Sequence, residues 1–469
     1  MAAAKPPTTR NREQPKFDLT KISARVDRVN VSGLLRTHND YVMKAAQGLF
    51  KARNFEEVML ESMHAKSYLH ELGIFKDVSV HIDVSRGDTA SPDGYEVTFK
   101  GKELPRILGS VGTEIGQNEG SLRTELTVPN LLGRGESISL QGSYSTKRAN
   151  DVQLKFWKSY FHTRFMKNRP ELSFSIFRRL DRVDISHFQN TNTGLLTELA
   201  VNTDYPIPLS HSVQYETSIR ELSLLGRTVP MAIRQQCGPK LASLARYSLI
   251  FDQRDNPVFP SNGIMLKAIN EYCGLGGNIA YISSCVHGEV SVPLFSGIVA
   301  QVCGRVGVVK ETKKTDYLPL SNLYLCGGPL TLRGFKYGGA GPVVDGTPIG
   351  AEVVSVSHYI QWECCNSRDG GVPLSWRTYW STGFHLWAPL PYRQVFKSFA
   401  NNFRTHVFYN AGNFNTFSVD HMRTSVGVGL AFKLAERARI ELNYCIPLRT
   451  CPSDKLNNGF QFGIGYEFV

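Results

Sequence analysis

The sequence has 469 residues, enough for two or three ordinary domains or for one large barrel with an accessory domain. Lysine and arginine total 53 against 41 aspartates and glutamates, a formal net charge of +12 that suits anionic lipid, nucleic acid or a basic lumen; we favour a basic lumen and basic loops. The uncharged run at residues 290–304 covers about 15 residues and contains a proline, whereas a spanning helix needs about 20. No transmembrane helix is therefore predicted.

Aromatic residues make up 11% of the chain and glycines number 41, a composition typical of strands and tight turns. The nine cysteines are scattered without a C-x-x-C pair, so we expect mostly free thiols and no metal site. No serine, histidine or acidic constellation stands out as catalytic, and no phosphate-binding glycine loop is present. We predict neither an enzyme nor a bound cofactor.

Residues 1–23 are polar, basic and contain prolines, a composition typical of a disordered tail. The segment has no apolar core of signal-peptide length, which argues against export to a bacterial outer membrane. Its prolines also interrupt any amphipathic presequence. We expect a protein that reaches its membrane from the cytosol.

Residues 24–103 predict a small α+β domain with the order strand, helix, helix, strand, strand. A short strand covers residues 24–31, Thr37 or Asn39 is expected to cap the first helix, and Asn54 the second. Two strands between residues 78 and 99 complete the domain. The simplest alternative is a packing domain that binds no client.

Residues 104–469 predict strands and turns throughout. Apolar side chains alternate with polar ones, and the charges fall on the non-apolar face, in residues 121–128, 211–220, 425–432 and 439–446. A soluble sandwich also buries one face of its strands. The strand number, a strand length near ten residues and roughly 360 residues without helices favour a large transmembrane antiparallel barrel.

The chain ends in a strand of strict alternation, residues 459–469, with an aromatic and aliphatic face. Such a strand must close a sheet, because its edge exposes unpaired backbone groups. The order polar, glycine, hydrophobic, hydrophobic resembles the β-signal that ends mitochondrial outer-membrane barrels. The positions that fit it are Gln461, Gly463, Tyr466 and Phe468.

Two further stretches resemble motifs of the BamA-like barrel-assembly superfamily. Residues 251–263 resemble its D-x-R-D-N, P-x-x-G turn, and the loop with Leu332, Arg333, Gly334 and Phe335 resembles its L-R-G-F motif. The resemblance implies that Arg333 turns into the lumen and pairs with an acidic residue, that Gly334 allows a tight bend, and that Phe335 packs beside it. The domain at residues 24–103 resembles a POTRA domain, which binds extended clients at a sheet edge.

Two shorter motifs, at residues 130–134 and 441–447, complete the resemblance. On these motifs the chain is identified as a member of the family of the central barrel subunit of the mitochondrial sorting and assembly machinery. The resemblance implies sixteen strands, a mitochondrial outer-membrane location and one POTRA-like domain toward the intermembrane space. Implied partners are β-barrel precursor proteins, membrane lipids, metaxin-like subunits and the cristae-organising complex. No nucleic acid is expected.

We expect the first barrel strand, near residues 107–116, to pair weakly with the terminal strand. Three glycines there supply little side-chain packing: Gly109, Gly112 and Gly116. A client's β-signal then replaces the terminal strand at this lateral seam. The alternatives are a protein-translocation or metabolite pore and a soluble all-β binding protein.

Residues 351–378 depart from the family pattern and predict an insertion in the barrel. This stretch contains His358, Trp362, Cys364, Cys365 and Trp376. Adjacent cysteines with one histidine suit tetrahedral metal geometry poorly. We interpret the stretch as an exposed loop at the barrel mouth, a lineage-specific extension or an error in the gene model.

Overall fold

The computed structural model describes residues 19–86, 90–116, 119–145, 150–159, 170–183, 186–203, 207–227, 229–312, 324, 326–341, 343–344, 347–348, 376–390, 402–414, 422–434, 438–452 and 454–465. The chain forms two compact units. The first is Met1–Leu108 with Val128–Ser137, and the second is Gly109–Thr127 with Ile138–Val469. The domain boundaries expected from the sequence stay predictions.

The first unit contains a three-stranded sheet with the order β1-β3-β2. Strand β1 (Arg25–Ser32) runs parallel to β3 (Gly94–Glu103), and β3 is antiparallel to β2 (Phe75–Val84). Between β1 and β2 come α1 (Asn39–Ala45), the 3-10 helix η2 (Gln47–Lys51) and α2 (Phe55–Glu71). The expected order of strand, helix, helix, strand, strand is confirmed.

The predicted start of the first helix is wrong. His38, rather than Thr37 or Asn39, is the N-cap of α1 and makes no side-chain capping bond. The Thr37 hydroxyl already donates to Glu103 Oε1 at 2.7 Å and accepts from Asn130 Nδ2 at 2.8 Å, so it is not available as a cap. Asn54 is the N-cap of α2 as predicted, without a side-chain bond.

Glu103 organises the segment before α1. Its carboxylate accepts hydrogen bonds from the backbone amides of Leu35, Arg36 and Thr37 at 3.1, 3.0 and 2.9 Å. Burial raises the pKa of the Glu103 carboxyl, but the hydrogen bonds from Thr37, Arg36 and Leu35 outweigh burial and lower that pKa to about 2. The carboxylate therefore holds this segment most firmly in its charged form.

The turn after strand β5 (Glu119–Val128) contributes to the first unit. Asn130 has a φ of 53°, and its Oδ1 accepts from Gly135 N at 2.8 Å. Gly133 O accepts from His38 N at 3.0 Å. A Cβ on Gly133 would lie 2.5 Å from Arg36 O, so this close backbone approach requires glycine. The N-L-L-G-R phrase thus has a local structural role.

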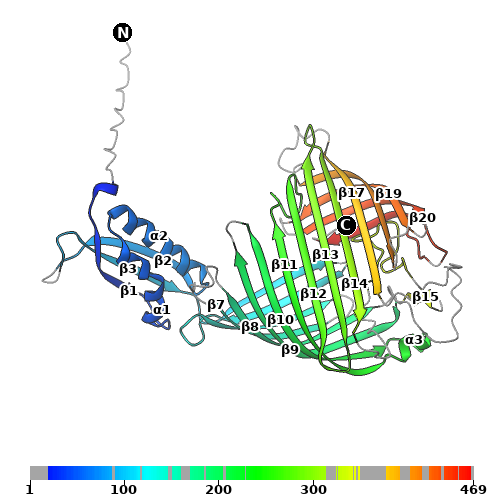
Figure 1. Cartoon of the computed structure of the whole chain (residues 1–469), viewed down its shortest axis with the longest axis horizontal. Coiled ribbons are helices and arrows are strands. Elements are labelled where there is room, and N and C mark those ends of the chain that lie inside the picture. The colour runs from blue at the N-terminus through cyan, green and yellow to red at the C-terminus, as the bar shows by residue number, and fades with distance from the viewer. Residues whose placement is uncertain are drawn as a thin grey trace, which may run out of the picture. The chain divides into compact units, whose positions relative to one another are not determined.

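The second unit contains a sheet of sixteen strands, which confirms the expected number. Each neighbouring pair whose register is described is antiparallel. In chain order the strands are β4 (Leu108–Gly116), β5 (Glu119–Val128), β6 (Glu136–Ser145), β7 (Asn150–Ser159), β8 (Glu171–Val183), β9 (Phe188–Thr203), β10 (Leu209–Leu224), β11 (Gly238–Asp252), β12 (Gly263–Gly277), β13 (Tyr281–Pro293), β14 (Val299–Glu311), β17 (Trp376–Pro389), β18 (Phe403–Phe414), β19 (Arg423–Leu434), β20 (Ala438–Arg449) and β21 (Gly459–Gly465). The strands curve into a barrel (Figure 1).

Among the described residues, three short elements lie between these strands. Helix α3 (Met231–Arg234) precedes β11. Strands β15 (Val343–Val344) and β16 (Thr347–Pro348) pair with each other between β14 and β17. No helix among the described residues is long and apolar enough to cross a membrane.

The two faces of the strands differ in solvent exposure as the alternation of the sequence predicts. On β10, Val213, Tyr215 and Ile219 are exposed, whereas Glu216 is buried. On β21, Phe460 and Phe462 are exposed and Gln461 is buried. The predicted outward apolar face and inward polar face are confirmed on these strands.

Several predictions concern segment ends. Residues 1–18 of the predicted tail and 351–375 of the predicted insertion lie outside the described residues. The 3-10 helix η1 (Leu19–Lys21) and the pairing of Ser23 with Asn54 start ordered structure before residue 24. Trp376, near the end of the predicted insertion, begins β17 and pairs with Lys310 of β14.

We predict that Glu103→Gln loosens the segment before α1. A neutral carboxamide accepts these amides more weakly, so hydrogen exchange at residues 35–37 should accelerate about tenfold in the full-length protein. Glu71→Gln, at an exposed position at the end of helix α2, is the control and should leave these amides unchanged.

The unchanged chain should lose protection at the same amides in acid, after correction for intrinsic exchange. Because the folded pKa is depressed, the stabilisation is complete above the unfolded value of about 4.3. It should disappear as the pH falls toward about 2. Equal exchange in Glu103→Gln and the unchanged chain would contradict this role.

Candidate functional site

The L-R-G-F motif lies inside the barrel, in the segment between β14 and β17. Leu332, Arg333 and Phe335 are each 0% exposed. Gly334 has a φ of 85°, which favours glycine, and a Cβ there would lie 3.3 Å from Ser425 Cβ. The motif therefore forms a tight bend pressed against the inner face of the barrel.

Arg333 makes an ion pair with Glu441 on the inward face of β20. The Arg333 Nη2 and Nε atoms lie 2.9 and 3.2 Å from Glu441 Oε2. Arg439 Nε lies 2.8 Å from the other carboxylate oxygen, Oε1, so one buried carboxylate faces two arginines. The Arg333 guanidinium also lies over the Phe408 ring at 5.1 Å. Glu441 is thus the acidic partner expected for Arg333.

The same loop is bonded to the terminal strand. Gln461 on β21 accepts from Gly334 N at 3.1 Å through Oε1 and donates through Nε2 to Phe335 O at 3.0 Å. Gly334 O accepts from Asn457 N at 2.9 Å, just before β21. The structure therefore brings together the loop motif and a residue predicted for the seam.

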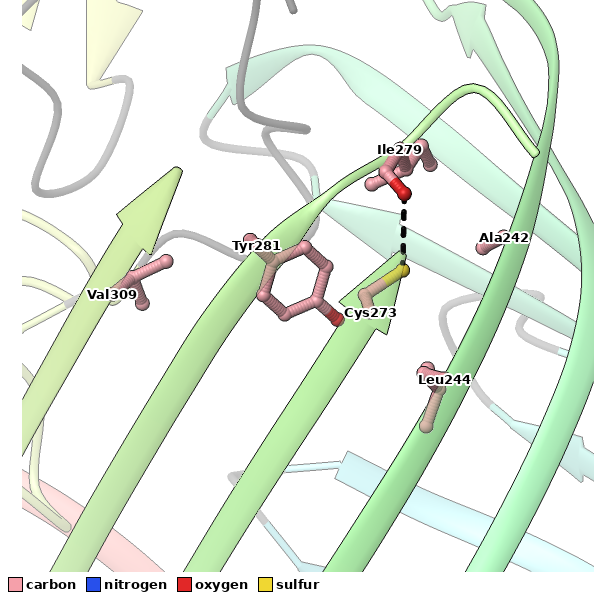
Figure 2. Close-up of a cluster of buried hydrophobic side chains, with 6 residues drawn as sticks. All are labelled: Ala242, Leu244, Cys273, Ile279, Tyr281 and Val309. Carbon is pink, nitrogen blue, oxygen red and sulfur yellow. Dashed lines mark hydrogen bonds between the residues drawn. The ribbon is translucent and has the colours of Figure 1, made fainter. Parts of the chain in front are cut away.

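A third contact fixes the beginning of this loop. Tyr324 packs against a buried cluster on the inner face of β11 to β14, and its ring lies tilted against that of Tyr379 on β17 with centroids 4.3 Å apart. Its hydroxyl lies 3.0 Å from Ser283 Oγ. Figure 2 shows this cluster, whose members are Ala242, Leu244, Cys273, Ile279, Tyr281 and Val309. Part of the barrel interior is thus an apolar core.

The D-x-R-D-N turn, between β11 and β12, also folds into the barrel. Asn256 Oδ1 accepts from the amides of Val258 and Phe259 at 2.9 and 3.0 Å, which shapes the turn. Val258 and Phe259 are buried against Trp387 of β17. Arg439 Nη1 donates to Val258 O at 3.4 Å. The turn and the L-R-G-F loop therefore meet at the pair formed by Arg439 and Glu441.

A second polar path joins the turn to Trp387. Arg254 Nη1 lies 3.0 Å from Glu289 Oε2, and Gln301 Nε2 donates to Glu289 Oε1 at 2.6 Å. Trp387 Nε1 donates to Gln301 Oε1 at 2.5 Å, and the Arg439 guanidinium lies over the Trp387 ring at 4.8 Å. These contacts anchor the turn inside the barrel, which the sequence motif alone did not predict.

A buried stack of aromatic rings was not predicted from the sequence. Trp387 stacks on His406 with ring centroids 4.1 Å apart, and the Nδ1 atoms of His385 and His406 lie 3.2 Å apart. His406 Nε2 lies 2.8 Å from Asn443 Oδ1. The signal was the spacing of His385 and Trp387, which places both on one face of a strand.

Those predicted seam residues that the structure describes lie at the two ends of the sixteen-stranded sheet, on β4 and β21. A Cβ on Gly112 would meet no atom within 4 Å, and one on Gly109 would lie 3.6 Å from Leu126. Gly116 ends β4, and Gly463 lies opposite Glu441 in the β20 ladder. Tyr466 and Phe468 lie outside the described residues.

Within the described ranges, no group of three histidine, cysteine, aspartate or glutamate residues is arranged to hold a metal ion. The buried charged groups of the site, Arg333, Arg439 and Glu441, instead pair with one another. The arrangement can hold two inward segments against strands β17 to β21.

Comparison with known proteins gives consistent matches. Residues 130–468 match the Omp85 superfamily domain. The chain is 66% identical over 454 residues to a SAM50-like protein of Drosophila melanogaster, covering 97% of both chains. It is 32% identical over 460 residues to the sorting and assembly machinery component 50 homolog of Homo sapiens, covering 95% of this chain and 90% of the relative.

The fold is also found among solved structures. The chain is similar to BamA from Haemophilus ducreyi lacking POTRA domains 1-3, with a TM-score of 0.73 and 18% identity. The match covers 94% of this chain and 84% of that one. The similarity therefore extends over nearly the whole chain.

We predict that Glu441→Ala destabilises the barrel by about 3–5 kcal/mol, because it leaves two buried arginines without their shared carboxylate. The free energy of unfolding of the purified protein in detergent micelles measures this loss. Leu442→Val, one position along β20 on the outward face, is the control and should cost less than about 1.5 kcal/mol. Equal losses in both variants would mean that the ion pair does not hold the interior together.

Proposed function

Because the chain belongs to the Omp85 superfamily and, within it, to the sorting and assembly machinery component 50 family, we propose that it inserts β-barrel precursors into the mitochondrial outer membrane through a seam between β4 and β21. Its family and fold support β-barrel assembly in an outer membrane. One observation carries the proposed seam: the first and last strands of the barrel are the two ends of the sheet.

The seam is suited to strand exchange. A strand edge in lipid exposes backbone donors and acceptors that cannot bond to water, so it favours any strand that pairs with it. Gly109 and Gly112 add almost no side-chain packing on β4. A client's β-signal replaces β21 at the seam, and the client then folds strand by strand. Local thinning of the bilayer near the short strand β4 assists this exchange.

The first unit acts as a POTRA-like receptor that faces the intermembrane space. Its sheet order, β1-β3-β2, leaves β1 and β2 as edges to which an extended client can add a strand. We assign metaxin-like subunits and the cristae-organising complex as partners from the family relationship. Membrane lipids contact the outward apolar face of the barrel.

A translocation or metabolite pore is the competing function for the same barrel. Its lumen would have to conduct water and solute. The buried loop at Arg333 and the buried turn at Phe259 occupy the interior from separate parts of the chain. This occupancy favours assembly over conduction.

The seam is tested by crosslinking. A photo-reactive amino acid at position 112, where a side chain meets open space, should crosslink to an arrested radiolabelled porin precursor in isolated mitochondria. The crosslink should require the precursor's β-signal, so a precursor with a scrambled β-signal is the control. Loss of the crosslink with intact ion conductance in planar bilayers would favour the pore.

An engineered disulfide between β4 and β21 separates the two functions. We expect the oxidised protein to lose precursor insertion and to recover it on reduction, because the seam cannot open while the strands are linked. Conductance in planar bilayers should not change between the two states. Unimpaired insertion by the fully oxidised protein would rule out the seam.

A further inference from the structure

The side chain of Gln461 is held by two backbone groups of the L-R-G-F loop. Gly334 N donates to Oε1 at 3.1 Å, and Phe335 O accepts from Nε2 at 3.0 Å. The Cys445 thiol lies 3.5 Å from the same Oε1. Gln461 is only 5% exposed, so water does not compete effectively for these bonds.

One donor beside one acceptor matches a specific side-chain chemistry. A carboxamide both accepts through its oxygen and donates through its nitrogen. A carboxylate only accepts and would face Phe335 O without a proton to share, whereas an ammonium group only donates and would leave Gly334 N without an acceptor. An apolar side chain satisfies neither backbone group.

Contacts outside β21 itself also hold the two backbone groups in place. Arg333, on one side, is anchored by Glu441 at 2.9 Å. On the other side, Lys336 N donates to Lys455 O at 2.9 Å, and Asn457 N donates to Gly334 O at 2.9 Å. Such preorganisation raises selectivity because little ordering remains when the ligand arrives.

We propose that Gly334 N and Phe335 O form a reading site for the side-chain carboxamide of whichever strand occupies the β21 position. In the resting protein the ligand is Gln461. During assembly it is the polar residue of a client's β-signal, an extended strand with a glutamine opposite Asn443. This inference rests on the seam exchange proposed above and adds a criterion by which the loop selects the entering strand.

The test uses the full-length protein with a photo-reactive amino acid at position 112 and peptides with the sequence of residues 459–469. The peptides carry Gln461, Gln461→Asn, Gln461→Glu or Gln461→Leu. At limiting concentration the glutamine peptide should crosslink about tenfold more than the glutamate and leucine peptides, with asparagine between them because it is one methylene shorter. Phe462→Leu, an outward position, is the matched control and should equal the unchanged peptide.

An Arg333→Ala chain tests the role of the loop. It should bring the yields of the glutamine and leucine peptides to within about twofold of each other, because the loop is no longer held against the terminal strand. A heat-modifiable band on a gel verifies that this barrel has folded. Persistent discrimination in a folded Arg333→Ala barrel would show that other groups read the side chain.

Failure of the reading site is distinguishable from failure of the seam. Equal crosslinking of all peptides to the unchanged chain overturns the reading site and leaves the seam intact. No crosslink with any peptide or with the porin precursor overturns the proposed seam, and the reading site with it. Only selective crosslinking of the glutamine peptide supports both.

Discussion

The interior of this barrel depends on Glu441. One carboxylate, fully buried on β20, faces Arg333 from a loop and Arg439 from its own strand. Two buried arginines beside one glutamate are stable only if the desolvation of all three is offset by close pairing and by further polar contacts. Asn443 supplies one such contact by donating to Glu441 Oε2 at 2.9 Å. Removing the carboxylate would leave both neighbours charged in a closed space.

From this centre the contacts extend to both inward segments. Arg333 continues into the bend at Gly334 and the terminal strand, whereas Arg439 continues to Trp387 and the turn at Val258. The two segments are more than 70 residues apart in sequence, yet they share one group of strands. The lumen there is packed like a protein core, with stacked rings, apolar clusters and paired charges. We interpret the barrel as a scaffold that positions its loops, with client strands handled at the edge of the sheet.

Much of this architecture can be predicted from periodicity. Alternation gives the inward and outward faces of β10 and β21, and it places Glu441 inward. It does not say which strands face each other across a barrel, so Glu441 could not be selected as the partner of Arg333 among the inward acids. The ring stack at Trp387 and His406 depends on two neighbouring strands in register, which no single stretch encodes. Thr37 failed as a helix cap because a distant residue, Asn130, uses the same oxygen.

The first compact unit is assembled from two separate stretches of chain, Met1–Leu108 and Val128–Ser137. Its last part is the turn around Asn130, which follows β4 and β5 in the sequence. As the polypeptide emerges from the ribosome, the unit cannot reach its final set of contacts until the first hairpin of the barrel has also been synthesised. The connectivity of the chain therefore determines when this unit can complete its folding. A fragment that ends at residue 108 lacks the side-chain amide of Asn130, which donates to Thr37, and the carbonyl of Gly133, which accepts from His38. Such a fragment begins folding without these two contacts.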